Sequence, residues 1–217
     1  LYLTVPLLVC QSVIVFYLTG AAIPKSVTDI FQLQSRYYSD PYYLASVIGA
    51  FTSLGMYLGM IGGTVAHELI HRNSNKDLII GYILLAPLWE TGFAIEHLHG
   101  HHRYVATIRD SATAHRGESI YRFYIRSSIA QITGARQIEK DRLLKHSIPD
   151  NLVNNRFVRG QLMSVFIMMI FILCYGVAFG FLACIYVASV GRLYIRITDY
   201  ITHYGLVRIL GLSLIHI

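Results

Sequence analysis

Charged residues are scarce in this 217-residue sequence, which is long enough for one domain. Only 14% of the residues are Asp, Glu, Lys or Arg, whereas 54% are hydrophobic and the mean hydropathy is +0.50. A soluble globular domain usually carries about a quarter charged residues. The shortage of charge therefore argues against an ordinary soluble domain and indicates a protein embedded in a membrane.

Cysteine is rare as well. The three cysteines, Cys10, Cys174 and Cys184, all lie in apolar stretches. Their spacing matches neither a zinc site nor a disulfide framework, so we expect buried packing residues. We also recognise no signal peptide with a cleavage site and expect none in these residues, because the first apolar segment is too long and too continuous. The chain begins at Leu1 and ends in an apolar run, and we expect it to be incomplete at both ends.

Acidic residues are too few to balance the basic ones, which leaves a formal net charge of +6. Residues 103–159 account for the whole excess, with eleven Lys or Arg against five Asp or Glu. A basic segment can indicate nucleic-acid binding. Because apolar spans flank this one, we interpret it as a cytoplasmic loop, helical in part, that follows the positive-inside rule. We expect no nucleic-acid partner.

Long uncharged runs make up much of the remaining chain. Residues 1–24 and 41–66 carry no charge, and each run is long enough for a membrane-spanning helix of about 20 residues. The polar connection between them contains the charged residues Lys25, Asp29, Arg36 and Asp40. Four glycines lie in the second run between Gly55 and Gly63, and such small residues let helices approach closely in lipid.

Two later apolar stretches predict further helices. Residues 78–89 are too few for a full span and indicate a tilted or re-entrant helix. The uncharged run 160–191 exceeds one span, so we predict a hairpin that turns near Gly180. The first helix would end near Ala178 and the second near Tyr204. Ionisable residues in a spanning helix usually face an interior site, and the second helix carries Arg192, Arg196 and Asp199.

Histidine is plentiful, with ten residues, and six of them fall in two short clusters. The first cluster reads His67-Glu68-Leu69-Ile70-His71 at the end of the second apolar run. Residues four apart share a helix face, so both imidazoles can point at one metal. The same pattern is the signature of zinc proteases, in which the glutamate is the general base. Alone, this cluster leaves both interpretations open.

The second cluster, from Glu96 to His102, favours more than one metal ion. His97 and His101 repeat the spacing of four, and His102 adds an adjacent ligand. His99 fits this spacing least well and is not expected to be a ligand. A zinc protease needs three protein ligands, so five suitable histidines exceed its demand and fit two ions in one cavity. Imidazole suits iron, copper, nickel and zinc alike.

Four segments carry a resemblance to a known family: HELIHR, EHLHGHHRYVAT, DSATAHRGESIYRF and DYITHYGL. From about residue 41 to about residue 208 their order and spacing resemble the membrane alkane and xylene hydroxylases (alkane 1-monooxygenase-like), within the membrane fatty-acid desaturase and hydroxylase superfamily. The resemblance implies an all-α, integral-membrane helical bundle with a cytoplasmic histidine-box di-metal site. Asp199 and Thr202 stand where the alkane enzymes usually have Asn and Glu, which leaves the substrate more open than the reaction. The ligands implied for the site are His67, His71, His97, His101, His102 and His203.

The same resemblance implies an activity. Two iron ions, O2 as co-substrate and two electrons would hydroxylate an unactivated or terminal carbon of an alkane, alkyl-aromatic or fatty acyl substrate. A rubredoxin or ferredoxin, with its reductase, would supply the electrons to a multi-pass protein of the bacterial inner membrane. The family has one more histidine box downstream of HYGL, which His216 does not recreate. We therefore expect an incomplete site and an inactive 217-residue chain.

Residues near the clusters predict supporting roles, with no catalytic residue beyond the metal site. A ligating imidazole commonly donates its second N–H to a carboxylate. Glu68 and Glu96 are the first candidates and Asp110 a weaker one. The basic segment would either dock an acidic electron donor or serve only topology and lipid head-group contact. Aromatic residues between the two clusters would line a substrate channel or belong to an interfacial belt: Tyr82, Trp89 and Phe93.

Three other classes of protein compete with this interpretation. A membrane metalloprotease explains the first histidine cluster but not the second. An acyl-lipid desaturase uses the same histidine boxes, so the pattern separates it poorly from a hydroxylase. A transporter or a bis-histidine haem protein fits less well, because paired histidines at a spacing of four suit direct metal ligation.

Overall fold

The computed structural model describes residues 2–19 and 42–208. The predicted polar connection and His216 lie outside these residues. Every regular element in the described ranges is a helix, which confirms the all-α class. In chain order the elements are α1 (Thr4–Leu18), α4 (Tyr43–Tyr57), η1 (Leu58–Gly62), α5 (Gly63–Ile70), α6 (Asn75–Leu85), η2 (Ala86–Leu88), α7 (Phe93–Glu96), η3 (His97–His101), α8 (His102–Tyr104), α9 (Ile120–Lys145), α10 (Arg156–Tyr175) and α11 (Val177–His203).

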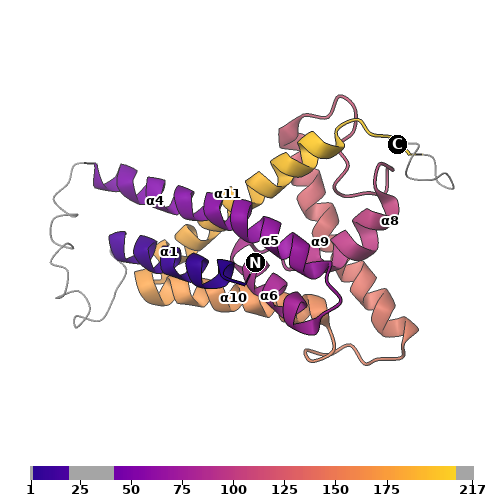
Figure 1. The fold of residues 1–217 in the computed structure, drawn as a ribbon, viewed down its shortest axis with the longest axis horizontal. Coiled ribbons are helices and arrows are strands. Elements are labelled where there is room, and N and C mark those ends of the chain that lie inside the picture. Colours follow the sequence, from indigo (N-terminus) through magenta and orange to yellow (C-terminus); the bar gives the residue numbers. More distant parts are fainter. Residues whose placement is uncertain (1, 20–41, 209–217) are drawn as a thin grey trace.

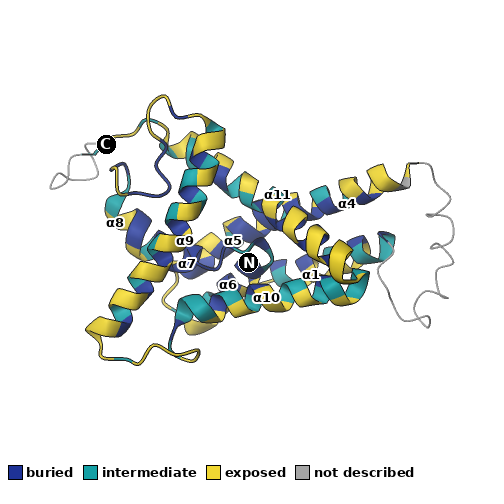
Figure 2. Cartoon of the chain, turned by 180° about the vertical axis from the view of Figure 1, so that it is seen from behind, coloured by how far each residue is buried: buried dark blue, intermediate teal, exposed yellow. Residues whose placement is uncertain are grey.

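Three helices in the described ranges are long and apolar enough to cross a membrane: Leu44–Ile70, Arg156–Tyr175 and Val177–His203. The apolar helix α1 has 15 residues there, and the remainder of the span predicted over residues 1–24 lies outside the described part. Figure 2 shows exposed residues along the outer faces of these helices. Many are large and apolar, such as Phe166, Leu173 and Leu182, which suits a surface that faces lipid.

The spanning helix Leu44–Ile70, which corresponds to the second uncharged run, continues directly into the first histidine cluster, as predicted. Helices α4 and α5 are continuous through η1, a π-helical turn, and His67 lies in the last turn of α5. π-Helical turns inside α-helices occur frequently at functional sites. The hydrophobic run thus delivers the histidines to one end of the bundle.

Helix α11 packs directly on the backbone of α4 and η1, which confirms the close approach predicted from the glycines. A Cβ atom on Gly59 would lie 2.6 Å from the carbonyl oxygen of Gly191. A Cβ on Gly55 would lie 2.7 Å from the carbonyl oxygen of Val187. Only glycine allows this contact, since real side chains do not approach backbone atoms so closely. The first and last spans are held together here.

The predicted hairpin exists, but its turn was misplaced. Helix α10 ends at Tyr175 and α11 begins at Val177, so Gly176 makes the turn instead of Gly180. Gly176 has φ +82°, a conformation that glycine adopts without strain. Gly180 lies inside α11, and a Cβ there would collide with the backbone of Phe171 in α10. Both glycines are required, one for the turn and the other for helix packing.

The basic segment is helical in part, as predicted. Its helix α9 runs across the end of the bundle where the first span ends (Figure 1). Glu139 of α9 is fully buried and accepts hydrogen bonds from Arg142 and from both the backbone and the side chain of Arg156. Burial alone would raise the pKa of Glu139, but these bonds lower it to about 2. This ionised carboxylate joins α9 to the start of α10.

The ionisable residues of α11 face the protein interior, which confirms the expectation for a spanning helix. The Arg196 side chain is 1% exposed, and its guanidinium contacts Glu90 at 2.9 Å and Asp199 at 2.9 Å. It also donates to Gln131 of α9. Arg192 contacts the same Glu90 carboxylate at 2.7 Å. These pairs connect α11 to the segment before α7 and to α9.

A substitution at Gly59 tests the helix contact. We expect Gly59→Ala to destabilise the protein by about 1–3 kcal/mol, because the added methyl group must push α11 away. Gly49→Ala, in the same span, is the matched control and should not destabilise, since a Cβ on Gly49 would meet no atom within 4 Å. The thermal unfolding midpoint in detergent measures both. Equal midpoints for the two variants would contradict the contact.

Candidate metal centre

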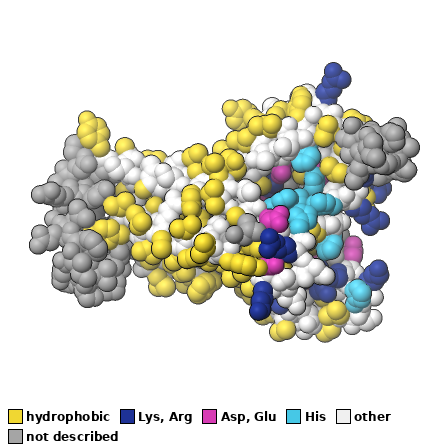
Figure 3. Space-filling model, viewed as in Figure 1, with side chains coloured by type: hydrophobic (Ala, Val, Ile, Leu, Met, Phe, Trp, Pro, Cys, Tyr) yellow, Lys and Arg dark blue, Asp and Glu magenta, His cyan; other side chains and the backbone are white. Residues whose placement is uncertain are grey.

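The predicted ligands come from the ends of four helical elements. His67 lies in the last turn of α5, and His71 directly follows that helix. His97 and His101 are the first and last residues of η3, His102 begins α8, and His203 is the last residue of α11. Figure 3 shows the histidine side chains gathered beside the end of the apolar bundle, with charged residues around them. The structure therefore brings all six predicted residues to one region.

Three of the predicted ligands approach the Nε2 atom of His97 through their own Nε2 atoms. The Nε2 atom of His97 lies 2.9 Å from that of His67, 3.2 Å from that of His71 and 3.0 Å from that of His102. The Nε2 atoms of His67 and His71 are 3.4 Å apart. His67, His71 and His97 alone already form a group that could hold a metal ion.

These spacings fit a transition-metal ion. Imidazole nitrogens that bind one ion at about 2.1 Å lie about 3.0 Å apart at right angles and about 3.4 Å apart in a tetrahedron. The three Nε2 distances from His97 and the His67–His71 distance run from 2.9 to 3.4 Å, close to this interval. An all-imidazole set suits iron, zinc, copper or nickel, so the donor atoms agree with iron without selecting it.

The π-helical turn η3 explains how His97 and His102 meet. In a regular α-helix only residues three and four apart share a face. A π-helix bonds residue i to i+5, so residues five apart also come to nearly the same side. The rings of His97 and His101 stack at 5.1 Å, while His102 reaches the Nε2 atom of His97. One short turn thereby presents three imidazoles to the same cavity.

The pKa of His97 keeps its ring neutral. Burial first, and then the neighbouring histidines, lower that pKa to about 2. A metal ligand must be the neutral imidazole, with a free lone pair. At any physiological pH, His97 is therefore in the protonation state that binds a cation.

His101 is held by a carboxylate on its far side. Its Nδ1 atom lies 3.0 Å from both oxygens of Asp110, which is 1% exposed. Burial would lower the pKa of His101, but the hydrogen bond and charge of Asp110 outweigh it and raise that pKa. Since Asp110 accepts the hydrogen bond from Nδ1, the Nε2 atom of His101 is left as the ligand atom.

His203 is oriented in a similar way by its own helix. Its Nδ1 atom lies 3.0 Å from the backbone carbonyl oxygen of Asp199, to which it donates. The rings of His203 and His101 lie edge to face, with centroids 4.9 Å apart. These two residues form a second group of imidazoles next to the four that converge on His97.

Both groups border one cavity of about 480 Å³. Its histidine lining consists of His67, His97, His101, His102 and His203. The remaining lining comes chiefly from Gly59, Gly63 and Phe93 on one side and from Tyr194, Thr198 and Asp199 of α11 on the other. The cavity thus combines nitrogen donors with a largely apolar space between the first and last spans.

The two glutamates expected beside the ligands do not contact them in the described residues. Glu68 is exposed and lies 3.5 Å from Arg72. Glu96 is buried and accepts a hydrogen bond of 2.8 Å from Ser111, and burial raises its pKa to about 7. Asp110, the weaker candidate, makes the histidine contact instead. Asp110 follows His101 by nine residues, so helical spacing gave no sign of the pairing.

The three aromatic residues between the clusters separate in the structure. Phe93 lines the histidine cavity and stacks on His97 with ring centroids 4.5 Å apart. Tyr82 lines other cavities, between α6 and α10. Trp89 lines none of these three cavities. His99, as expected, lies apart from the histidine cavity and borders one of those near Tyr82.

Two residues that the sequence did not single out, Glu90 and Gln131, lie close behind the site. Glu90 and Gln131 hold Arg196, which in turn pairs with Asp199 at the cavity. The one available signal for Glu90 was its position in an apolar stretch. Gln131 had no signal, because its importance comes from the packing of α9 on α11.

The fold and the histidines together define an integral membrane protein with a histidine cluster that could hold a metal. Residues 4–213 match the family described as "Fatty acid desaturase". The chain belongs to this family, and the similarities to alkane and xylene monooxygenases confirm the resemblance found in the sequence.

Several curated relatives are similar to this chain over most of its length. Alkane 1-monooxygenase 1 of Pseudomonas aeruginosa is 35% identical over 164 residues, which cover 74% of this chain and 42% of that protein. Alkane 1-monooxygenase 2 of Alcanivorax borkumensis is 30% identical over 185 residues, 84% of this chain and 47% of that protein. The hydroxylase component of xylene/toluene monooxygenase from Pseudomonas putida is 30% identical over 165 residues, 75% and 44% of the two chains. The chain thus spans less than half the length of these relatives.

The Asp110–His101 contact can be tested by Asp110→Asn. The amide can still accept the hydrogen bond from Nδ1 but lacks the charge that strengthens it, so we expect metal affinity to fall about 10- to 100-fold. Competition with a chelator measures this affinity, and circular dichroism checks that helix content is kept. Asp141→Asn, an exposed residue that contacts Gln137, is the matched control. Unchanged affinity in the Asp110 variant would remove this residue from the centre.

Proposed function

We propose that this chain carries most of the catalytic centre of a membrane non-haem di-iron monooxygenase. The reaction would place one oxygen atom of O2 on an unactivated or terminal carbon of a hydrophobic substrate, with two electrons reducing the other to water. The relatives named as alkane and xylene/toluene monooxygenases support this reaction class. The substrate class is an alkane, an alkyl-aromatic compound or a fatty acyl chain.

One observation carries the proposal: nitrogen donors from three separate segments converge beside an apolar cavity. The Nε2 atoms of His67, His71 and His102 lie 2.9–3.2 Å from that of His97, and His101 and His203 form an adjacent pair. Two adjacent groups of imidazoles support two ions, which we propose to be iron. When bound, iron supplies the capacity to bind and reduce O2 that no side chain has. Its ligands would be His67, His71, His97, His101, His102 and His203.

The chain's own residues would position the ligands and the substrate. Asp110 and the carbonyl group of Asp199 fix the ring tautomers of His101 and His203. Phe93 packs on His97 and keeps water from that face of the ring. Tyr194 and Thr198 lie on the α11 side of the cavity, so a hydrophobic substrate would enter between α5 and α11.

The contacts of Glu68 favour an oxygenase over a zinc protease. In a protease this glutamate would be the general base and would have to reach the metal-bound water. Here the Glu68 side chain is 57% exposed, and its carboxylate pairs with Arg72 at the surface. The alternative within the family is an acyl-lipid desaturase, which would use the same ligands. Product analysis with a saturated substrate separates alcohol from alkene.

Electron delivery would come from a small acidic redox protein of the rubredoxin or ferredoxin class, served by its reductase. The segment 103–159 follows the histidine box directly and carries the excess of basic residues. Opposite charge steers such partners together and speeds association. We place this side in the cytoplasm of a bacterial inner membrane, where these donors occur.

Two substitutions separate the oxygenase from the protease. We expect His101→Ala to remove metal and oxygen-dependent alcohol formation, because a ligand is lost. We expect Glu68→Gln to keep the metal and to lower activity by less than about tenfold, the smaller end of the effect of an outer partner. Both are made in the full-length protein, with iron, zinc, O2 uptake and alcohol as the measurements. One zinc ion, no O2 uptake and peptide cleavage that survives His101→Ala would refute the proposal.

Cysteine labelling tests the orientation. The basic excess predicts that Lys145, at the end of α9, faces the cytoplasm. In a variant without native cysteines, Lys145→Cys should react with a membrane-impermeant maleimide only after cell lysis. Val177→Cys is the matched control, since Val177 is 75% exposed at the hairpin turn at the other end of the spans. Labelling of position 145 in intact cells would reverse the orientation and separate the site from its electron donor.

A further inference from the structure

Two adjoining cavities lie apart from the histidine cavity, beside helix α6. We call the first, of about 170 Å³, the arginine pocket; its polar lining includes Arg72, Asn73, Asn75, His99 and Arg156. We call the second, of about 160 Å³, the α6–α10 groove; it is lined by Leu78, Ile79, Tyr82, Arg159 and Met163, among others. Leu78, Tyr82 and Arg156 border both, so the polar pocket opens directly onto the apolar groove.

The pocket lies at the boundary of the apolar spans. One span ends at Ile70, two residues before Arg72, and another begins at Arg156. Both ends are on the same side of the bundle as the histidines. Helices that cross a bilayer place such residues at the level of the lipid head groups, where long basic side chains meet phosphate.

The arginine pocket keeps a positive charge after its ion pairs are counted. Glu139 is shared by Arg142 and Arg156, so these three residues retain one positive charge. Glu68 meets Arg72 at 3.5 Å, but the two side chains are 57% and 40% exposed, and such a pair at the surface is weak. Arg159, at the edge of the groove, is exposed and adds a further charge. An anion is therefore favoured.

Neutral donors complete the polar lining. The amide side chains of Asn73 and Asn75 border the pocket, and α6 begins at Asn75. His99 adds a ring N–H. Arginine guanidinium groups match the oxygens of a phosphate with paired hydrogen bonds.

The α6–α10 groove, in contrast to the arginine pocket, is mainly apolar. Its side chains from α6 and α10 are mostly apolar, and Ile79 is 58% exposed. An exposed apolar surface next to a cationic pocket, at the end of two spans, matches a molecule with an anionic head and a hydrocarbon chain. A free phosphate ion would use only the pocket.

We propose that an anionic phospholipid binds here, with its phosphate in the arginine pocket and one acyl chain along the α6–α10 groove. The lipid would join the start of α6 to the start of α10. Arg156 also donates a hydrogen bond to Glu139, which connects α10 to α9. The site is separate from the histidine cavity and does not depend on its metal or reaction.

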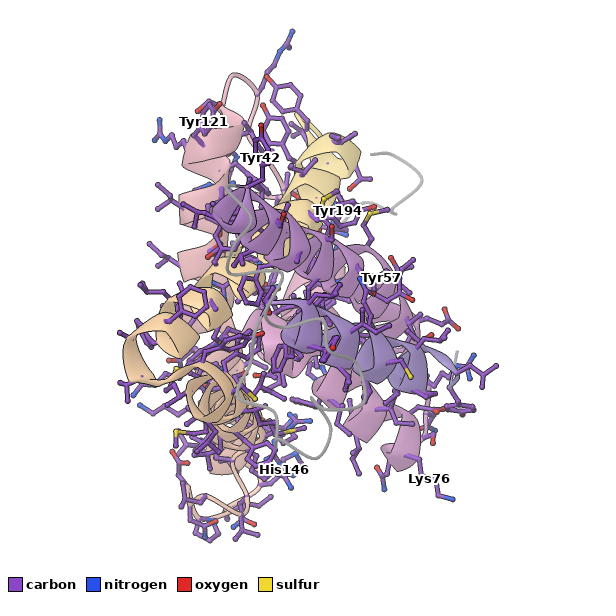
Figure 4. All side chains as sticks on the ribbon, turned by 90° about the vertical axis from the view of Figure 1, so that its left-hand side faces the viewer. Tyr42, Tyr57, Lys76, Tyr121, His146 and Tyr194 are labelled. Atoms are coloured by element: carbon purple, nitrogen blue, oxygen red, sulfur yellow. The ribbon has the colours of Figure 1, made fainter. Side chains whose placement is uncertain are left out.

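Exposed arginines provide the first test. Arg72→Gln with Arg159→Gln removes two charges while leaving Arg156 to neutralise Glu139. The control is Arg122→Gln, an exposed arginine of α9 next to Tyr121. In the view of Figure 4, Tyr121 and Lys76 lie at opposite edges of the molecule, and Lys76 is the second residue of α6.

Affinity is measured from the rise of the thermal unfolding midpoint in detergent as lipid is added. Dioleoyl phosphatidylglycerol should raise the midpoint, dioleoyl phosphatidylcholine should bind more weakly, and inorganic phosphate should give no comparable rise. Each arginine near a lipid surface contributes about a fivefold gain in affinity, so the double variant should bind phosphatidylglycerol about 25-fold more weakly. Arg122→Gln should bind as the unaltered protein does.

Ile79→Asn tests the contact between the acyl chain and the α6–α10 groove without removing a charge. This variant should also bind phosphatidylglycerol more weakly. An equal rise with inorganic phosphate would show a simple anion site and overturn the lipid proposal. Equal rises with both lipids, or unchanged affinity in both the arginine and the Ile79 variants, would overturn it as well.

Discussion

The contact between the first and last spans determines the position of everything else in the site. Gly55 and Gly59 meet α11 without side chains between them, and Gly191 completes the contact. Because lipid offers no hydrophobic drive for helix association, close packing of this kind supplies the stability. It also places the ends of α5 and α11 together, so that His67 and His203 border the same cavity.

A buried arginine and its partners lie beside that cavity. Arg196 is fully buried in a helix that can cross a membrane, where an unpaired charge is costly. Glu90 and Asp199 pair with it, and Gln131 adds a neutral acceptor from α9. The histidine cavity is therefore bordered by charges that each have a partner.

Much of the architecture could be predicted from the sequence, because the uncharged runs and the spacing of four are local signals. They indicated the spans, the glycine contact and the pairing of His67 with His71. The turn at Gly176 was missed since the surrounding residues are equally apolar around Gly180, and composition does not distinguish a turn glycine from a packing glycine. Asp110 was undervalued because a loop brings it to His101, and helical spacing does not describe loops.

The two histidine clusters differ in the backbone that carries them. The first cluster lies on a regular helix, and a spacing of four suffices to aim two rings. The second lies in a π-helical turn, which aims His97, His101 and His102 from one short segment. A π-helical turn leaves the backbone less regular, so the segment needs external support. Asp110 on one side of His101 and Phe93 against His97 provide it, each from a different element. The more ligands a short segment presents, the more its geometry depends on residues elsewhere in the chain.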